Sequence, residues 1–187
     1  DAGNYTITQP TATANITAKG LTVTGITATN RVYDATTDAT ALLDKTAAAL
    51  SGVVAGDTVT MDHTSATASF TDKAIGAGKT VNIAGITISG TDAGNYTLSQ
   101  PSTTADITAK TLTVSGITAA NKTYNASTVA TLNTGSAAFV GVESGDTVTI
   151  GVGSATGAFA DKTIGTGKTV QVSGVTKSGA DAGNYTI

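Results

Sequence analysis

The sequence Asp92-Ala-Gly-Asn-Tyr-Thr97 occurs three times in this chain of 187 residues, beginning at Asp1, Asp92 and Asp181. The second occurrence starts 92 − 1 = 91 residues after the first, and the third 181 − 92 = 89 residues after the second. This period exceeds the roughly 20 to 50 residues of a solenoid repeat and matches a small β-domain. The sequence therefore predicts a stretch of a tandem array of domains, in which length and spacing matter more than chemistry.

The composition excludes several classes of function. Charged residues make up 12% of the chain, aromatic residues 4%, and the net charge is −3, so no basic patch for nucleic acid is expected. No apolar run approaches the roughly 18 residues of a membrane span. The chain has no cysteine, which excludes disulfides and thiolate metal sites. We therefore predict no cofactor, no nucleic-acid partner and no membrane span.

Alternation of apolar and polar residues predicts β-strands throughout the repeat. Clear alternation occurs in residues 21–24, 58–61, 66–70, 81–88, 96–99 and 105–108. Residues 42–55 are predicted to be loop or poorly regular, because the two copies differ in length there. A short helix over residues 40–50 is disfavoured by the poor helix formers in the second copy. About seven strands per repeat predict an all-β fold of tandem immunoglobulin-like antiparallel β-sandwiches.

The repeated hexapeptide resembles the tyrosine corner of immunoglobulin-like sandwiches, in which a tyrosine hydroxyl bonds to nearby backbone. The predicted structural residues are Asp92, Gly94, Tyr96, Asp181, Gly183 and Tyr185. We expect a structural role for them rather than a ligand-binding one.

The position of this corner sets the predicted domain boundaries. Residues 1–19 would be the closing hairpin of a preceding repeat, residues 20–110 a complete sandwich, and residues 111–187 a second sandwich without its last strand. The predicted junction residues are Lys19, Gly20, Lys110 and Thr111. Because no Gly/Ser-rich linker separates Lys110 from Thr111, we expect a stiff rod.

Three segments carry a resemblance to a known family: Ala105–Lys110, Ala160–Val170 and Ser178–Tyr185. They are similar to the MBG/YDG repeats of large bacterial surface and secreted proteins of the filamentous-haemagglutinin adhesin type. The Tyr-Asp-Gly signature of these repeats corresponds to Tyr33-Asp34-Ala35 and Tyr124-Asn125-Ala126, both of which lack the glycine. The resemblance implies a repeat module of a long surface protein and supplies no catalytic residues.

Other candidate sites are weaker. Gly76–Thr80 and Gly165–Thr169 are similar to a phosphate-binding loop, but Lys73 and Lys162 occupy the position of its first glycine, so a turn before a strand is predicted. His63 is the single histidine and forms no catalytic triad or typical zinc site.

Two alternatives for stabilising the chain stay open. One is calcium between the domains, held by aspartates from Asp57, Asp72, Asp92, Asp146, Asp161 and Asp181. The other is an isopeptide bond between Lys19 or Lys110 and Asn30 or Asn121.

The function predicted from these observations is structural and non-enzymatic: an extracellular stalk or fibre at a bacterial cell surface. The alternative is an adhesin module that binds a glycan or a host protein, although such a site usually contains a cluster of exposed aromatic residues. The predicted partners are neighbouring repeats of the same protein. Other copies of the chain are a further possible partner, because residues 8–19 continue the sequence motif that ends at Ile187, which allows head-to-tail strand donation.

Overall fold

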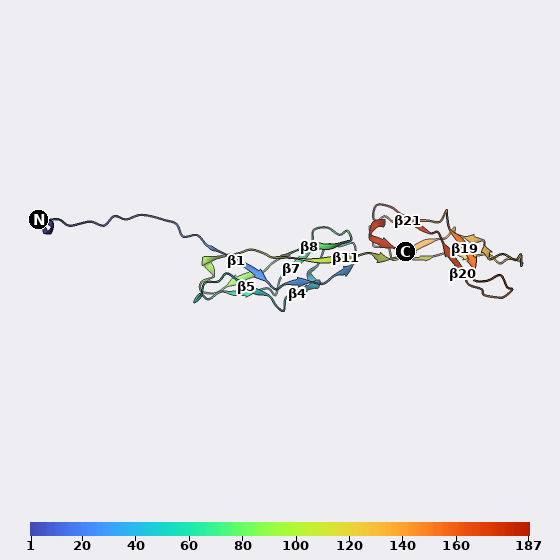
Figure 1. Ribbon diagram of the computed structural model, residues 1–187, viewed down its shortest axis with the longest axis horizontal. Helices are drawn as coiled ribbons and strands as arrows, with labels where there is room; N and C mark the ends of the chain where they lie inside the picture. The colour runs from blue at the N-terminus through green and yellow to red at the C-terminus, as the bar shows by residue number, and fades with distance from the viewer.

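The computed structural model describes residues 1–187 as two β-units arranged end to end (Figure 1). We call β1–β11 unit 1 and β12–β22 unit 2. No helix is longer than a single 3₁₀ turn, so the predicted all-β class is confirmed. The 3₁₀ turns are η1 (Ala2–Asn4), η2 (Thr40–Leu42), η3 (Ala93–Asn95) and η4 (Ala182–Asn184).

Unit 1 contains eleven short strands. They are β1 (Lys19–Thr24), β2 (Thr27–Ala28), β3 (Arg31–Val32), β4 (Leu43–Asp44), β5 (Ala49–Ser51), β6 (Thr60–Asp62), β7 (Thr67–Phe70), β8 (Gly76–Ala84), β9 (Thr87–Ser89), β10 (Tyr96–Leu98) and β11 (Ser102–Thr108).

Unit 2 also contains eleven short strands, but they do not match those of unit 1 one for one. Its strands are β12 (Lys110–Thr111), β13 (Thr113–Ser115), β14 (Thr118–Ala119), β15 (Val129–Ala130), β16 (Leu132–Asn133), β17 (Ala138–Val140), β18 (Thr149–Gly151), β19 (Thr156–Phe159), β20 (Val170–Ser173), β21 (Thr176–Ser178) and β22 (Tyr185–Thr186).

The largest sheet of unit 1 has the strand order β3-β11-β8-β7. Its central strand, β11, runs antiparallel to β8 and parallel to β3. A second sheet, β10-β1-β5, combines a parallel and an antiparallel pair. The first strand of each unit has a parallel partner, since β1 pairs with β10 and β12 pairs with β22. The immunoglobulin-like arrangement stays a prediction, because the parallel pairs were not expected in a purely antiparallel sandwich.

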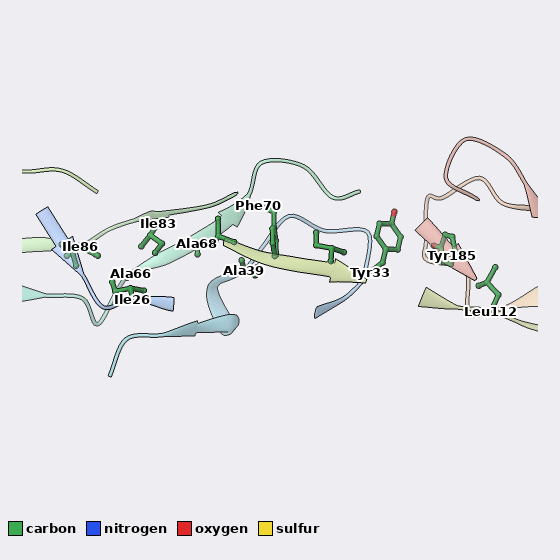
Figure 2. Close-up of a cluster of buried hydrophobic side chains, with 14 residues drawn as sticks. Ile26, Tyr33, Ala39, Ala66, Ala68, Phe70, Ile83, Ile86, Leu112 and Tyr185 are labelled. Carbon is green, nitrogen blue, oxygen red and sulfur yellow. The ribbon is translucent and has the colours of Figure 1, made fainter. Parts of the chain in front are cut away.

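The core of unit 1 follows the predicted alternation. Ala66, Ala68 and Phe70 of the β7 segment are buried, as are Val81 and Ile83 of β8. The two buried residues of β11 are Ala105 and Ile107, exposed by only 4% and 2%. Figure 2 shows Ala66, Ala68, Phe70 and Ile83 in the same cluster. Burial of such aliphatic side chains contributes about 1.5–3 kcal/mol each and holds the sheets together.

Residues 42–55 were predicted to be loop or poorly regular, and they contain only two short strands, β4 and β5, of which β5 pairs with β1. The expected number of strands was wrong, since eleven short strands replace about seven. Gly25 separates β1 from β2 with a φ of 77°, and a Cβ there would lie 2.0 Å from the carbonyl oxygen of Ala47. Only glycine fits this bend, which separates β1 from β2.

Ala35 and Ala126 are the only residues other than glycine with a positive φ, 61° in both cases. They follow the Tyr-Asp and Tyr-Asn pairs at the positions where the resembling family carries glycine. Because this region costs an L-residue about 1–2 kcal/mol, we expect Ala35→Gly to raise the free energy of unfolding by about 0.4–1 kcal/mol after the entropy cost of glycine. Urea unfolding measures this change. Ala74→Gly, at a loop alanine without positive φ, is the control and is expected to destabilise; a loss of stability in Ala35→Gly would contradict the account.

Candidate functional site at the junction of the two units

The junction between the units centres on the carboxylate of Asp146, which lies in the loop between β17 and β18. Its side chain is 0% exposed. Its Oδ1 is 2.8 Å from Nζ of Lys73, and its Oδ2 accepts hydrogen bonds of 2.7 Å from the hydroxyls of Tyr33 and Tyr185. Lys73 and Tyr33 belong to unit 1, whereas Tyr185 belongs to unit 2. A buried charge of unit 2 is thus neutralised chiefly by unit 1, which makes the two units depend on each other.

Local structure places each of these donors. Tyr33 follows β3, and its backbone N–H bonds to the carbonyl of Thr108 at 2.8 Å, at the end of β11. Lys73 lies in the loop between β7 and β8. Tyr185 opens β22 and is aligned with Lys110 in the parallel pair β12–β22. Two of the donors therefore come from loops of unit 1, and the third comes from the strand pair β12–β22 of unit 2.

An apolar contact surrounds the polar centre. The rings of Tyr33 and Tyr185 meet edge to face, with centroids 5.4 Å apart and an interplanar angle of 76°. Figure 2 shows Tyr33 at the end of unit 1 opposite Tyr185 and Leu112 of unit 2. The exposure of these three residues is 1–2%, and they are continuous with the core cluster of unit 1. Aromatic pairs in this geometry add about 0.5–1.5 kcal/mol to the burial of their area.

Further polar contacts lie around the centre. Nζ of Lys73 is also 3.7 Å from Oδ1 of Asp181, and the backbone N–H of Ile75 donates to Oδ1 of Asn184 at 3.2 Å. Lys110 pairs with Glu143 within unit 2, next to the junction. Since β11 ends at Thr108 and β12 begins at Lys110, a single residue separates the strands of the two units. The junction is therefore held by side chains on several sides and has no flexible linker.

The electrostatics of the junction favour the protonation states that these bonds require. Burial acts to raise the pKa of Asp146, but the hydrogen bonds from Lys73, Tyr33 and Tyr185 outweigh it and lower the pKa below its usual value. Burial and the bond to Asp146 raise the pKa of Tyr185 to about 12 and also raise the pKa of Tyr33. The bond to Asp146 raises the pKa of Lys73. At neutral pH the site holds one carboxylate, one ammonium and two neutral hydroxyls.

This arrangement predicts a loss of stability at alkaline pH. A raised pKa in the folded state means that the stabilisation is complete below the unfolded value, 10.0 for tyrosine, and is lost as the pH rises through the folded value. We therefore expect the free energy of unfolding to fall between pH 10 and about 12, the folded value of Tyr185, and above it. Urea unfolding at several pH values measures this fall. In Tyr33→Phe the slope should be shallower; an equal slope in wild type and variant would contradict the assignment. The pH dependence due to Asp146 runs in the opposite direction, because its pKa is lowered in the folded state. Its stabilisation is complete above the unfolded value of 3.8 and is lost as the pH falls through the lower folded value.

The predicted tyrosine-corner residues are arranged alike in both units. The Tyr96 hydroxyl accepts from the backbone N–H of Val54 at 3.0 Å and donates to Asp57 at 2.5 Å. The Tyr185 hydroxyl accepts from the backbone N–H of Glu143 at 2.9 Å. In each case the hydroxyl bonds to the backbone, and the backbone partner lies 42 residues earlier in the sequence. The tyrosine therefore ties its strand to a loop that is distant along the chain.

The other residues of the motif have lesser parts. Oδ2 of Asp92 accepts from the N–H of Thr58 at 2.8 Å, and Oδ2 of Asp181 accepts from the N–H of Thr147 at 2.9 Å. Gly94 and Gly183 lie within η3 and η4. Among the expected junction residues, Lys110 and Thr111 form β12, whereas Lys19 and Gly20 begin β1.

The centre of the junction was not predicted from the sequence. Tyr33 was considered only as part of a signature, Lys73 as the wrong residue in a phosphate loop, and Asp146 as a candidate calcium ligand. The signal that was available is their recurrence, since Tyr124, Lys162 and Asp57 occupy the corresponding positions of the other copy. No single repeat shows these residues as a cluster, because the cluster forms only between two repeats.

The structure does not bring together the other candidate sites. It contains no group of three or more His, Cys, Asp or Glu side chains placed to hold a metal ion. Asn30 is bonded to Asp106, and Lys110 is paired with Glu143, so neither faces the isopeptide partner considered from the sequence. The segment similar to a phosphate loop begins β8, where Lys79 bonds to Asp72 at 2.6 Å. Nδ1 of His63 is buried without a hydrogen-bond partner. No helix has the length and apolar character needed to cross a membrane.

Comparison with known families gives one finding. The model of the YDG domain matches residues 17–105 and again residues 108–187. Neither the curated proteins nor the solved structures contained a match to the chain. The two matched segments together cover most of the chain and coincide closely with unit 1 and unit 2.

Proposed function

This chain belongs to the YDG domain family, of which it contains two copies, and from this premise we propose that it is a structural, non-enzymatic repeat that forms a stiff stalk or fibre. In this proposal the parent is a bacterial surface or secreted protein of the filamentous-haemagglutinin adhesin type, and the repeat, also related to MBG repeats, lies outside the cell. The role requires only that the repeats hold a fixed length and direction.

The observation that carries this proposal is the buried carboxylate of Asp146, shared by two units without a linker. Bending the chain at this point would separate Lys73 and Tyr33 from the carboxylate and expose the Tyr33–Tyr185 contact. The side chain of Lys73 is 41% exposed, so the ion pair is only half-buried, but each buried group left without its partner costs about 1–3 kcal/mol, and a bent arrangement would be rare. A rigid connection between successive domains is the property that a stalk needs.

Recurrence of the junction residues supports the same role. At the start of unit 1, Tyr96 donates to Asp57 as Tyr185 does to Asp146. At the far end of unit 2, Tyr124 and Lys162 occupy the positions of Tyr33 and Lys73. The same junction therefore has the residues to form repeatedly along an array. The alternative predicted from the sequence, a glycan- or host-protein-binding module, stays a prediction.

Small-angle X-ray scattering tests the proposed role. A compact protein of this length has a radius of gyration of about 16 Å. We expect a clearly larger radius and the scattering profile of a rod, unchanged over a range of concentrations low enough to keep the chain monomeric. The stalk would be contradicted by a scattering profile of a compact particle, or by one of a flexible chain, at concentrations where the chain is monomeric.

A further inference from the structure

The strands at the two ends of unit 1 lie along the direction in which a stalk is pulled. Figure 1 shows β1 and β11 along the long axis of the molecule, both running toward unit 2. The backbone enters unit 1 through β1, which begins at Lys19, and leaves it through β11, which ends at Thr108. Tension along the stalk therefore acts along these two strands rather than across them.

The entry strand β1 is paired with the strand that leads to the exit. β10 runs parallel to β1, with Lys19 opposite Tyr96 and Leu21 opposite Leu98, and the N–H of Ser99 donates to the carbonyl of Leu21 at 3.0 Å. Three residues after β10 the chain continues as β11. Tension pulls β1 in one direction and β10 in the other, so the two strands must slide past each other. Sliding loads all the hydrogen bonds of the pair at once, whereas separating two strands from one end loads them one after another.

The exit strand β11 is held in the same way. It runs parallel to β3, with Ile107 opposite Arg31 and Thr108 opposite Val32. The carbonyl of Thr108 accepts from the N–H of Tyr33 at 2.8 Å, and the hydroxyl of Thr108 donates to the carbonyl of Arg31 at 3.2 Å. The last residues of unit 1 before the junction are therefore also loaded by sliding.

The entry into unit 2 repeats the parallel arrangement. β12 runs parallel to β22, with Lys110 opposite Tyr185, and the N–H of Leu112 donates to the carbonyl of Thr186 at 2.7 Å. Because only one residue separates β11 from β12, tension passes directly from the exit strand of unit 1 to the entry strand of unit 2.

Side chains strengthen the pair formed by β1 and β10. Leu21 and Tyr96 are buried, so water has little access to replace the hydrogen bonds between these strands as they are strained. The hydroxyl of Tyr96 also bonds to the N–H of Val54 and to Asp57, which fixes β10 to the loop before β6. Sliding of β1 past β10 must therefore expose apolar side chains in addition to breaking the ladder.

We propose that unit 1 carries mechanical tension, and that the parallel pairs β1–β10 and β3–β11, here called the loaded pairs, resist its extension by shear. The inference rests on the proposed stalk, because only a stalk is pulled along its length. It adds a function that rigidity does not supply: the domain stays folded while the cell surface and an attached object are drawn apart.

Force measurements on single molecules of the full chain test the proposal at constant force. The chain has no cysteine, so two introduced cysteines fix the points at which the molecule is pulled. Thr17→Cys with Thr111→Cys, both at exposed positions, pulls unit 1 along its axis. Thr67→Cys with Ala84→Cys is the control, because these exposed residues are opposite each other at one end of the antiparallel pair β7–β8, which is then separated from that end.

The direction of pulling should decide the unfolding rate, which governs forced unfolding. At equal force we expect unit 1 to open about tenfold or more slowly when pulled along its axis than when β7 is pulled away from β8. The number of paired residues predicts the reverse, since β7–β8 has four pairs in register and β1–β10 has three. Axial pulling should release residues 19–108 in a single step. Equal rates in the two directions, or an early release of β1 alone at low force, would overturn the proposal.

A pair of conservative variants identifies the strands that yield. Leu21→Val and Ile83→Val each remove one methylene from a buried side chain, and Ile83 lies on β8, outside the loaded pairs. Under axial tension Leu21→Val should unfold about threefold or more faster than Ile83→Val, when urea unfolding shows similar losses of stability for both. Equal acceleration by the two variants would exclude β1–β10 as the resisting pair.

These outcomes are separate from that of the stalk. The scattering experiment measures the shape of the chain without force, and a straight rod can still consist of domains that open easily. A chain that is a rod but opens equally fast in both pulling directions would retain the stalk and overturn the load-bearing role.

Discussion

Replacing Asp146 by alanine is expected to lower the free energy of unfolding by about 2–6 kcal/mol, about 1–3 kcal/mol for each of the two buried hydroxyls that lose their acceptor. The carboxylate accepts from Lys73, Tyr33 and Tyr185, and its removal leaves two buried hydroxyls without their acceptor. Urea unfolding followed by circular dichroism measures the loss. Should the variant not fold, Asp146→Asn keeps the shape and one acceptor oxygen, and about 1–3 kcal/mol is expected.

The chain contains its own control for this change. Asp57 occupies the equivalent position of unit 1 and accepts from Tyr96, but it has no lysine partner and is only half-buried. Asp57→Ala should therefore cost much less, about 0.5–1.5 kcal/mol for one hydrogen bond. Equal losses at the two positions would show that the junction contributes nothing beyond the tyrosine–aspartate pair common to both units.

The second large effect is expected at Tyr33, where replacement by alanine should cost about 3–5 kcal/mol, as for other buried aromatic side chains. The ring is 1% exposed, packs edge to face on Tyr185 and donates to Asp146. Tyr124→Ala is the matched control, since Tyr124 is the counterpart of Tyr33 and is 58% exposed; a loss of about 0.5 kcal/mol or less is expected. Chemical denaturation of both variants at low concentration measures the difference. Similar losses at both positions would contradict a special role for the junction.

The sequence predicted the parts of the fold that depend on local pattern. The alternation in residues 66–70 and 81–88 identified β7, β8 and β9, because one face of each strand is buried. The strands within residues 42–55 were missed, because β4 and β5 are only two and three residues long and their pattern is too short to detect. Their positions are fixed by pairing with β2 and β1 rather than by their own sequence.

The junction was beyond the reach of pattern analysis for a different reason. Tyr33 and Asp146 lie 113 residues apart, and Lys73 and Asp146 lie 73 apart, so no motif contains them together. Tyr185 was identified as a structural residue, yet its acceptor was not. The repeat did determine the answer indirectly, because a residue needed at a junction recurs in each copy. Tyr, Lys and Asp do recur here, at Tyr33 and Tyr124, Lys73 and Lys162, and Asp57 and Asp146, although their recurrence alone does not show that they meet between two units.

The most direct measurement of the central claim, that the junction holds the two units rigidly, is a distance distribution between spin labels in the two units. The chain has no cysteine, so Ser65→Cys and Ser154→Cys introduce two unique labels at equivalent exposed positions of unit 1 and unit 2. Double electron–electron resonance should give one narrow distribution in the otherwise wild-type chain, and a broader one when Asp146→Asn is added. A broad distribution in the chain that retains Asp146 would contradict the account.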